Sequence, residues 1–217
     1  EGACLSSHTK FNNNHRIFGL ALSRLLGAVA LISCAIVVIC DIVMWFLVSG
    51  YNPISQTISE LAAGPYHNVQ DAGIVIFVVG LLSLAFVLFL RGEAGWKPWL
   101  VRIAMILLAL DITFIALWNE YGDGVPGGIE IHIYLVALLY PLVPIILWFG
   151  TSVLPAKHGE FTKLAKATTV IWLLLAPVFF ILPTSVDGLY ERGLGGVIIG
   201  AVFIAAWRLF TDPDSEA

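Results

Sequence analysis

Long runs of apolar residues alternate with short polar connections along most of the chain. The clearest run, Ala72 to Leu90, carries no charged residue. As an α-helix it would rise about 28 Å, close to the ~30 Å hydrocarbon thickness of a bilayer. Five further runs of similar length occupy residues 25–49, 99–118, 131–154, 167–186 and 188–210. The pattern therefore predicts six membrane-spanning helices.

These spans use up most of the chain, so we expect one all-α transmembrane domain over residues 1–217 and no separate soluble domain. Hydrophobic residues make up 59% of the sequence and charged residues 12%, with a mean hydropathy of +0.92. About a quarter of the residues in soluble domains are charged, so this composition excludes a water-soluble globule. Membrane lipids are the expected partners, and nucleic acid is not expected to be one.

The basic residues predict how the bundle is oriented. The first, third and fifth connections hold only Arg192, whereas the two termini and the second and fourth connections hold the other ten basic residues. These are Lys10, Arg16, Arg24, Arg91, Lys97, Arg102, Lys157, Lys163, Lys166 and Arg208. Because cytoplasmic segments are enriched in Lys and Arg, both termini are predicted to be cytoplasmic.

The first connection, residues 51–73, is too polar to cross a membrane and too patterned for a simple tether. Asn52 and Pro53 can start a helix, and Gly64 and Pro65 can stop one. The apolar residues between them fall on one helical face: Ile54, Ile58 and Leu61. We expect a short interfacial helix from Pro53 to Ala63 that covers the outer end of the bundle. The alternative is a plain surface loop.

Ionisable residues inside or near the spans mark the candidate site, because a charge in the bilayer is costly and needs a partner. Asp41 and Asp111 lie within spans, each eight residues from the outer end, which predicts equal depth. We expect a polar pocket in the outer part of the bundle, with Glu60 lowered onto Arg192 or His132. Its candidate residues are Asp41, Ser59, Glu60, Asp111, His132, Glu191 and Arg192. The alternative is that each aspartate joins a separate hydrogen-bond network between helices.

Four features of the sequence resemble a known family: "ISEL" at 58–61, Gly80, "EIH" at 130–132 and "GLYERGLGG" at 188–196. They are similar to the family called domain of unknown function 998, and the resemblance covers nearly all six spans. It implies a small six-helix protein of the inner (plasma) membrane, mostly bacterial, and no settled activity, substrate or cofactor. The chain departs from the family at "NEYGDGVPGGIE", residues 119–130, where a proline-led, threonine-rich stretch is expected. A ligand contact shared at that connection is therefore not carried over.

Two classes of function stay open. One is a non-catalytic accessory or lipid-binding subunit of a larger membrane complex. It is favoured because no complete catalytic set is visible and because glycines in the last span would allow close helix contact: Gly193, Gly195, Gly196 and Gly200. The other is a membrane-embedded hydrolase that acts on a lipid headgroup, with zinc held by His67, Asp71 and His132. Two histidines are fewer than the three that such enzymes usually use, so no cofactor is the first expectation.

The orientation is tested by cysteine accessibility in sealed cells, after the three native cysteines are replaced. Cysteines introduced at residues 66 and 124 should react with a membrane-impermeant reagent added outside, and one at residue 160 should not. Labelling of residue 160 from outside would reverse the assignment of the termini.

Overall fold

The computed structural model describes residues 2–118, 131–153 and 159–211, with side chains from residue 18 onward. The described part consists of helices joined by short connections and contains no strand. In chain order its elements are α1 (Gly2–Leu47), α2 (Ile58–Ala62), α3 (His67–Leu90), α4 (Trp96–Leu117), α5 (Ile131–Gly150), α6 (Gly159–Leu175), a 3₁₀ helix η1 (Ala176–Ile181) and α7 (Asp187–Thr211).

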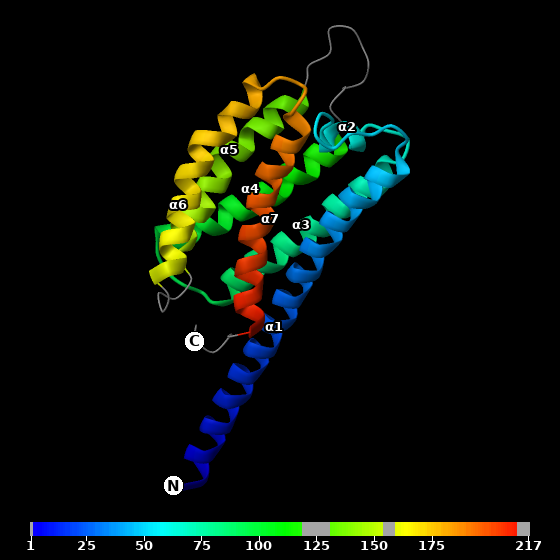
Figure 1. Ribbon diagram of the computed structural model, residues 1–217. Helices are drawn as coiled ribbons and strands as arrows, with labels where there is room; N and C mark the ends of the chain where they lie inside the picture. Colours follow the sequence, from blue (N-terminus) through cyan, green and yellow to red (C-terminus); the bar gives the residue numbers. More distant parts are fainter. Residues whose placement is uncertain (1, 119–130, 154–158, 212–217) are drawn as a thin grey trace.

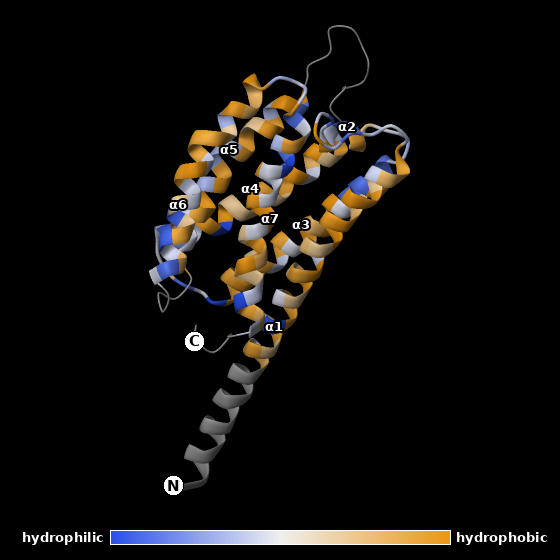
Figure 2. Ribbon diagram, viewed as in Figure 1, coloured by the Kyte–Doolittle hydropathy of each residue, from blue (hydrophilic) through white to orange (hydrophobic). Residues whose placement is uncertain are grey.

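Six helical segments of the described part are long and apolar enough to cross a membrane, which confirms the predicted all-α bundle of six spans. They are Phe18–Leu47, His67–Leu90, Trp96–Leu117, Ile131–Gly150, Gly159–Ile181 and Asp187–Thr211. Apolar residues cover these helices along most of their length, and polar residues gather near their ends (Figure 2).

Both termini lie at one end of the bundle, and α2 lies at the other (Figure 1). We call these the terminal end and the α2 end. The connection 119–130, where the sequence departs from the resembling family, lies outside the described residues.

The span boundaries differ most from the sequence prediction at α1 and α6. The apolar part of α1 begins at Phe18, and α6 begins at Gly159, eight residues before the predicted start at 167. Lys163 and Lys166 are the reason for the error at α6. They interrupt the apolar run but not the helix, because lysine is a good helix former.

Two prolines shape the contact between α5 and α6. Pro144 has no N–H to donate to the carbonyl of Tyr140, and Trp172 Nε1 on α6 donates to that carbonyl at 3.3 Å. Pro177 similarly leaves the carbonyl of Leu173 without its helical partner, and the Tyr140 hydroxyl donates to it at 3.1 Å. The α-helix gives way to η1 at Ala176, where Pro177 stands within the first turn. The two helices therefore satisfy each other's freed backbone groups, as the absence of water in a bilayer requires.

Glycines allow α1 and α3 to pack closely. A Cβ at Gly80 would lie 1.9 Å from Ser33 Oγ, and one at Gly73 would lie 2.7 Å from Cys40 Cβ. Within the chain, a Cβ at Gly193, Gly195, Gly196 or Gly200 of α7 would meet no atom within 4 Å. Close contact of these glycines with a partner helix stays a prediction. Helix α1 also lies close to the end of α7, where a Cβ at Gly27 would lie 2.9 Å from the carbonyl oxygen of Ala206.

The short helix in the first connection begins later than predicted. Asn52 and Pro53 form a turn in which Asn52 Oδ1 accepts from the backbone N–H of Ile54 at 3.0 Å. Helix α2 starts only after Thr57, whose side chain accepts from the backbone N–H of Glu60 while the Glu60 carboxylate accepts from that of Thr57. This capping box fixes the start of α2 at Ile58.

Candidate functional site

Two polar clusters meet at the α2 end because their central residues, Glu191 and Arg192, are consecutive in the first turns of α7. We call them the Arg192 cluster and the Ser59 cluster. A third feature, an apolar cavity, lies between the helices and extends to the terminal end.

In the Arg192 cluster, the guanidinium group forms a bidentate ion pair with Asp41 of α1. Nε donates to Asp41 Oδ2 and Nη2 to Oδ1, each at 3.0 Å. The two side chains are only 12% and 15% exposed. A planar guanidinium matches a carboxylate in this geometry, which a lysine would not do. The pair joins α7 to α1.

The remaining donors of Arg192 hold the first connection against α7. Nη1 lies 3.0 Å from the carbonyl of Pro53, 2.9 Å from that of Gln56 and 3.0 Å from that of Gly188. Nη2 also donates to the Tyr51 hydroxyl. All five N–H donors of the arginine thus have acceptors, which lowers the cost of burying its charge.

Tyr51 accepts from Arg192 and donates onward to the carbonyls of Gln56 at 2.9 Å and Thr57 at 3.1 Å. Burial raises the pKa of Tyr51 to about 12, against the lowering effect of Arg192. The phenol is therefore neutral at physiological pH and keeps the proton that it donates.

Only glycine fits at residue 188. A Cβ there would lie 2.1 Å from the carbonyl oxygen of Gln56. The next backbone N–H, that of Leu189, donates to the carbonyl of Ile54 at 3.0 Å. The first connection thus lies directly against the first turn of α7.

In the Ser59 cluster, one hydroxyl lies between an imidazole and a carboxylate. Ser59 Oγ is 3.0 Å from His132 Nε2 and donates to Glu191 Oε1 at 3.1 Å. His132 Nδ1 is 2.7 Å from the carbonyl of Trp118, and Glu191 Oε2 accepts from the backbone N–H of Ile58. The cluster connects α2, α5, α7 and the end of α4.

The hydrogen bonds around His132 fix the position of one ring proton. A carbonyl only accepts, so His132 Nδ1 carries a proton. Ser59 has one hydroxyl proton and lies between His132 Nε2 and the Glu191 carboxylate, so the two groups compete for it.

The predicted pairing of Glu60 with Arg192 or His132 is wrong. Glu60 Oε2 accepts from the backbone N–H of Thr57 at 2.9 Å, within the capping box. The acceptors of Arg192 are Asp41, Tyr51 and backbone carbonyls, and His132 is reached by Ser59, the residue before Glu60. The capping box with Thr57 holds the Glu60 side chain at the start of α2, so the carboxylate does not pair with either residue.

Asp111 does not join these clusters. It is 2% exposed, and neither of its carboxylate oxygens has a hydrogen-bond partner among the described residues. Arg102 Nε donates to the carbonyl of Leu88 at 3.0 Å, which sets the register of α4 against α3. Asp111 follows Arg102 by nine residues on α4, and Val79 precedes Leu88 by nine residues on α3. Because the two helices are antiparallel, Asp111 lies level with Val79.

The prediction that Asp41 and Asp111 lie at equal depth is therefore wrong. Asp41 is next to Cys40, which packs at Gly73 of α3. Val79, the level of Asp111, is six residues further along α3, so Asp111 lies about 9 Å deeper at 1.5 Å per residue. Counting from the helix ends failed because α1 and α4 end at different heights along α3.

The three residues considered for zinc are not gathered at one point. His67 Nδ1 lies 3.0 Å from Asp71 Oδ2, one turn further along α3. Both ring nitrogens of His132 are engaged in the Ser59 cluster. Within residues 18–118, 131–153 and 159–211, no group of three His, Cys, Asp or Glu side chains could hold a metal ion.

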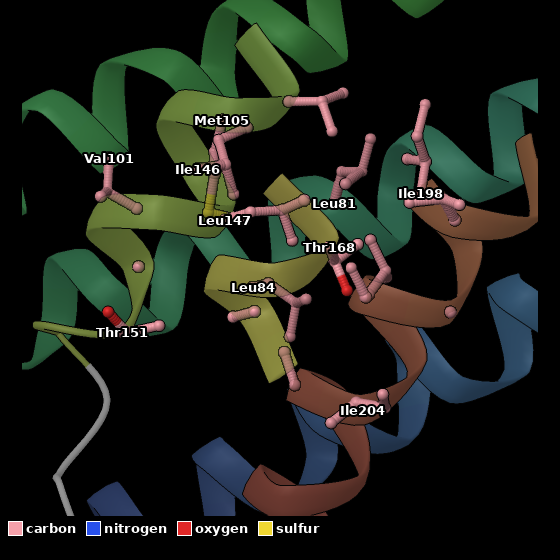
Figure 3. Close-up of a pocket in the computed structure, with 18 of the residues that line it drawn as sticks. Leu81, Leu84, Val101, Met105, Ile146, Leu147, Thr151, Thr168, Ile198 and Ile204 are labelled. Atoms are coloured by element: carbon pink, nitrogen blue, oxygen red, sulfur yellow. The ribbon is translucent and has the colours of Figure 1, made fainter. Parts of the chain in front are cut away.

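The apolar cavity has a volume of about 340 Å³ and is lined by side chains of α3, α4, α5, α6 and α7. Leu81, Leu84, Met105, Ile146 and Ile198 border it, as Figure 3 shows. Among the lining residues, only Thr151 and Thr168 carry polar side-chain atoms. The α7 glycines Gly196 and Gly200 also line this space, which explains why a Cβ there would meet no atom.

Sequence reasoning missed Tyr51, Gly188 and the backbone carbonyls that surround Arg192. Tyr51 stands beside Asn52 in a connection rich in turn residues, where a tyrosine gives no signal of its own. The cavity had no signal either, because its volume depends on how five helices pack.

Replacing Arg192 should destabilise the protein strongly. Arg192→Ala would leave Asp41 as an uncompensated, largely buried charge, which typically costs about 3 to 5 kcal/mol. We expect the thermal unfolding midpoint in mild detergent to fall far more than in Arg24→Ala, which removes an exposed arginine of α1. Arg192→Lys should not restore the midpoint, because an ammonium cannot bind both carboxylate oxygens in the same way. Equal midpoints for Arg192→Ala and Arg24→Ala would contradict the assigned role.

Comparisons with known proteins bear on the identity of the chain. No curated protein and no solved structure matched it. The family described as "Protein of unknown function (DUF998)" matches residues 20–208 of the 217. The match includes the stretches 58–61 and 188–196, which the structure brings into contact through Ser59 and Glu191. The chain therefore belongs to the DUF998 family of proteins of unknown function.

Proposed function

We propose that this protein is a lipid-binding membrane protein whose bundle holds an acyl chain of a membrane lipid. The observation that supports this function is the apolar cavity of about 340 Å³ between α3, α4, α5, α6 and α7. Pockets for small molecules have volumes of roughly 300 to 1,000 Å³ and mostly apolar walls. The cavity falls within this range, and its lining suits a hydrocarbon.

The driving force is van der Waals contact rather than the hydrophobic effect. A lipid chain is already out of water, so moving it from the bilayer into the bundle removes no further apolar surface from water. Atoms that line an empty space lack partners on one side and lose their dispersion energy. A chain that fills the cavity restores those contacts.

The helices around the cavity are arranged so that the space persists. Helix α7 makes many contacts with α1 and few with α6. The Arg192 cluster fixes its first turns, and Gly27 of α1 approaches the backbone of Ala206 and Phe210 near its end. Because α7 is held on the α1 side, its glycine face stands away from α5 and α6. Association with a larger membrane complex stays a prediction.

Filling the cavity from α7 should expel the lipid. In Gly200→Phe the new ring would enter the cavity, and we expect the lipid that co-purifies in mild detergent to fall about tenfold, equivalent to ~1.4 kcal/mol. Native mass spectrometry of the full chain measures the bound lipid.

Gly193→Phe is the matched control. Residue 193 also faces open space but does not line the cavity, so this variant should keep its lipid. Equal lipid content in wild type and Gly200→Phe, with both folded, would refute lipid binding in the cavity.

A second candidate function, an esterase acting on a membrane lipid, is supported by the Ser59–His132 contact of 3.0 Å. With its proton on Nδ1, a neutral His132 has a lone pair on Nε2 that can take the Ser59 proton while Oγ attacks an ester carbonyl. The proton then passes to the departing alcohol, which leaves the acyl group on Ser59 Oγ. Water gives a proton to His132 Nε2 and attacks this ester, and the carboxylic acid leaves as Ser59 regains its proton. Glu191 competes for the same serine proton, so lipid binding is the better supported function.

A fluorophosphonate probe distinguishes the two candidates, because it reacts with serines that a neighbouring base activates. If Ser59 is a nucleophile, the probe should label the wild type and Ser55→Ala but not Ser59→Ala. Ser55 lies in the same connection and provides the control. An unlabelled wild type would rule out the esterase and leave lipid binding unaffected.

A further inference from the structure

The terminal end of the bundle is strongly cationic. Of the residues at this end whose side chains are described, two are acidic, Glu93 and Glu160, and seven are basic: Arg24, Arg91, Lys97, Arg102, Lys163, Lys166 and Arg208. At the α2 end, by contrast, Arg192 is the only lysine or arginine of the described part. The cavity reaches the cationic end, where Phe161 of α6 and Leu209 of α7 line it.

Arg208 stands at the edge of the cavity. Its guanidinium carbon lies 4.2 Å from the ring centroid of Phe161, a lining residue, and its neighbour Leu209 also lines the space. The side chain is half-buried, and no carboxylate in the described part of the chain pairs with it. An arginine that rests on a ring has its edge donors free for an anion.

Two lysines of α6 lie at the same end of the bundle. Lys163 and Lys166 are exposed, and at about 100° per residue they lie on the face of α6 opposite the lining residues Leu164 and Ala165. Lys166 Nζ lies 5.3 Å from the ring centroid of Trp148. Long basic side chains of this kind bury their stems in apolar surface and present the charge at the interface.

We propose that the occupant of the cavity is an anionic phospholipid, with one acyl chain in the cavity and its phosphate bound by Arg208. This inference rests on the proposed lipid-binding function and adds the class of lipid. Arginine binds phosphate oxygens through two parallel N–H donors, and basic residues at the membrane surface attract anionic lipids.

The dimensions fit a lipid of a single leaflet. From Leu209 to Val197, both lining residues, α7 rises about 18 Å at 1.5 Å per residue. One leaflet contributes about half of the ~30 Å hydrocarbon core, or roughly 15 Å. A phosphate at Arg208 would therefore place the acyl chain along the cavity as far as the middle of the bundle.

The test compares two lipids with identical acyl chains, phosphatidylglycerol and phosphatidylcholine, offered in equal amounts to the full chain in mild detergent. Native mass spectrometry measures the ratio of the two bound species. We expect the wild type to favour phosphatidylglycerol about fivefold or more, which corresponds to ~1 kcal/mol. Arg208→Gln should bring the ratio close to one.

Arg24→Gln is the matched control, because it removes one positive charge at the same end from a helix that contributes no residue to the cavity lining. Its ratio should equal that of the wild type. Arg208→Lys, which keeps the charge but not the two parallel N–H donors, should lower the ratio and serves as the second test if Arg208→Gln does not fold.

The outcomes separate the inference from the function on which it rests. If Gly200→Phe lowers the binding of both lipids but the wild type binds them equally, the anionic preference is overturned and lipid binding stands. If the wild type favours phosphatidylglycerol but Arg208→Gln and Arg208→Lys keep the wild-type ratio, the phosphate site at Arg208 is overturned and lipid binding stands. If Gly200→Phe lowers neither lipid, both the proposed function and this inference fail.

Discussion

The buried ion pair between Arg192 and Asp41 is the interaction on which the α2 end depends. A buried charge in a membrane protein needs hydrogen-bond partners, and Arg192 obtains its acceptors from α1, from the first connection and from its own helix. This requirement fixes where α7 begins. It also places the preceding residue, Glu191, against Ser59, and through His132 the connection reaches α5 and the end of α4.

The two sides of the bundle are packed differently, and the cavity follows from that difference. On one side α1 contacts α3 at Gly73 and Gly80, where a Cβ would clash. On the other side α6 and α7 share few contacts, and Gly196 and Gly200 face the cavity. Glycine therefore serves opposite purposes in the two places: it permits contact between α1 and α3, and it leaves volume between α7 and its neighbours.

The helices could be predicted from the sequence because bilayer thickness imposes a span length that apolar runs reveal directly. The proximity of Asp41 and Arg192 was also foreseeable, since a buried carboxylate needs a base and that end holds one arginine. The position of Glu60 was predicted wrongly because Thr57, only three residues away, forms a capping box with it, and this local interaction needs no contact with a distant residue. Asp111 was misplaced because helix ends do not share one height. The cavity lay beyond sequence reasoning because it is a product of packing.

A comparison of the two arginines of α7 favours the terminal end for the lipid binding that we propose. Arg192 has all its donors engaged by protein acceptors, so a ligand could bind it only by breaking the ion pair that holds α7 in place. Arg208 rests on the ring of Phe161 and has no carboxylate partner in the described part of the chain. The charge of Arg192 therefore serves to hold the helices together. Arg208 lies at the edge of the apolar cavity, where a lipid with an anionic headgroup would pair with the guanidinium and its hydrocarbon tail would fill the cavity.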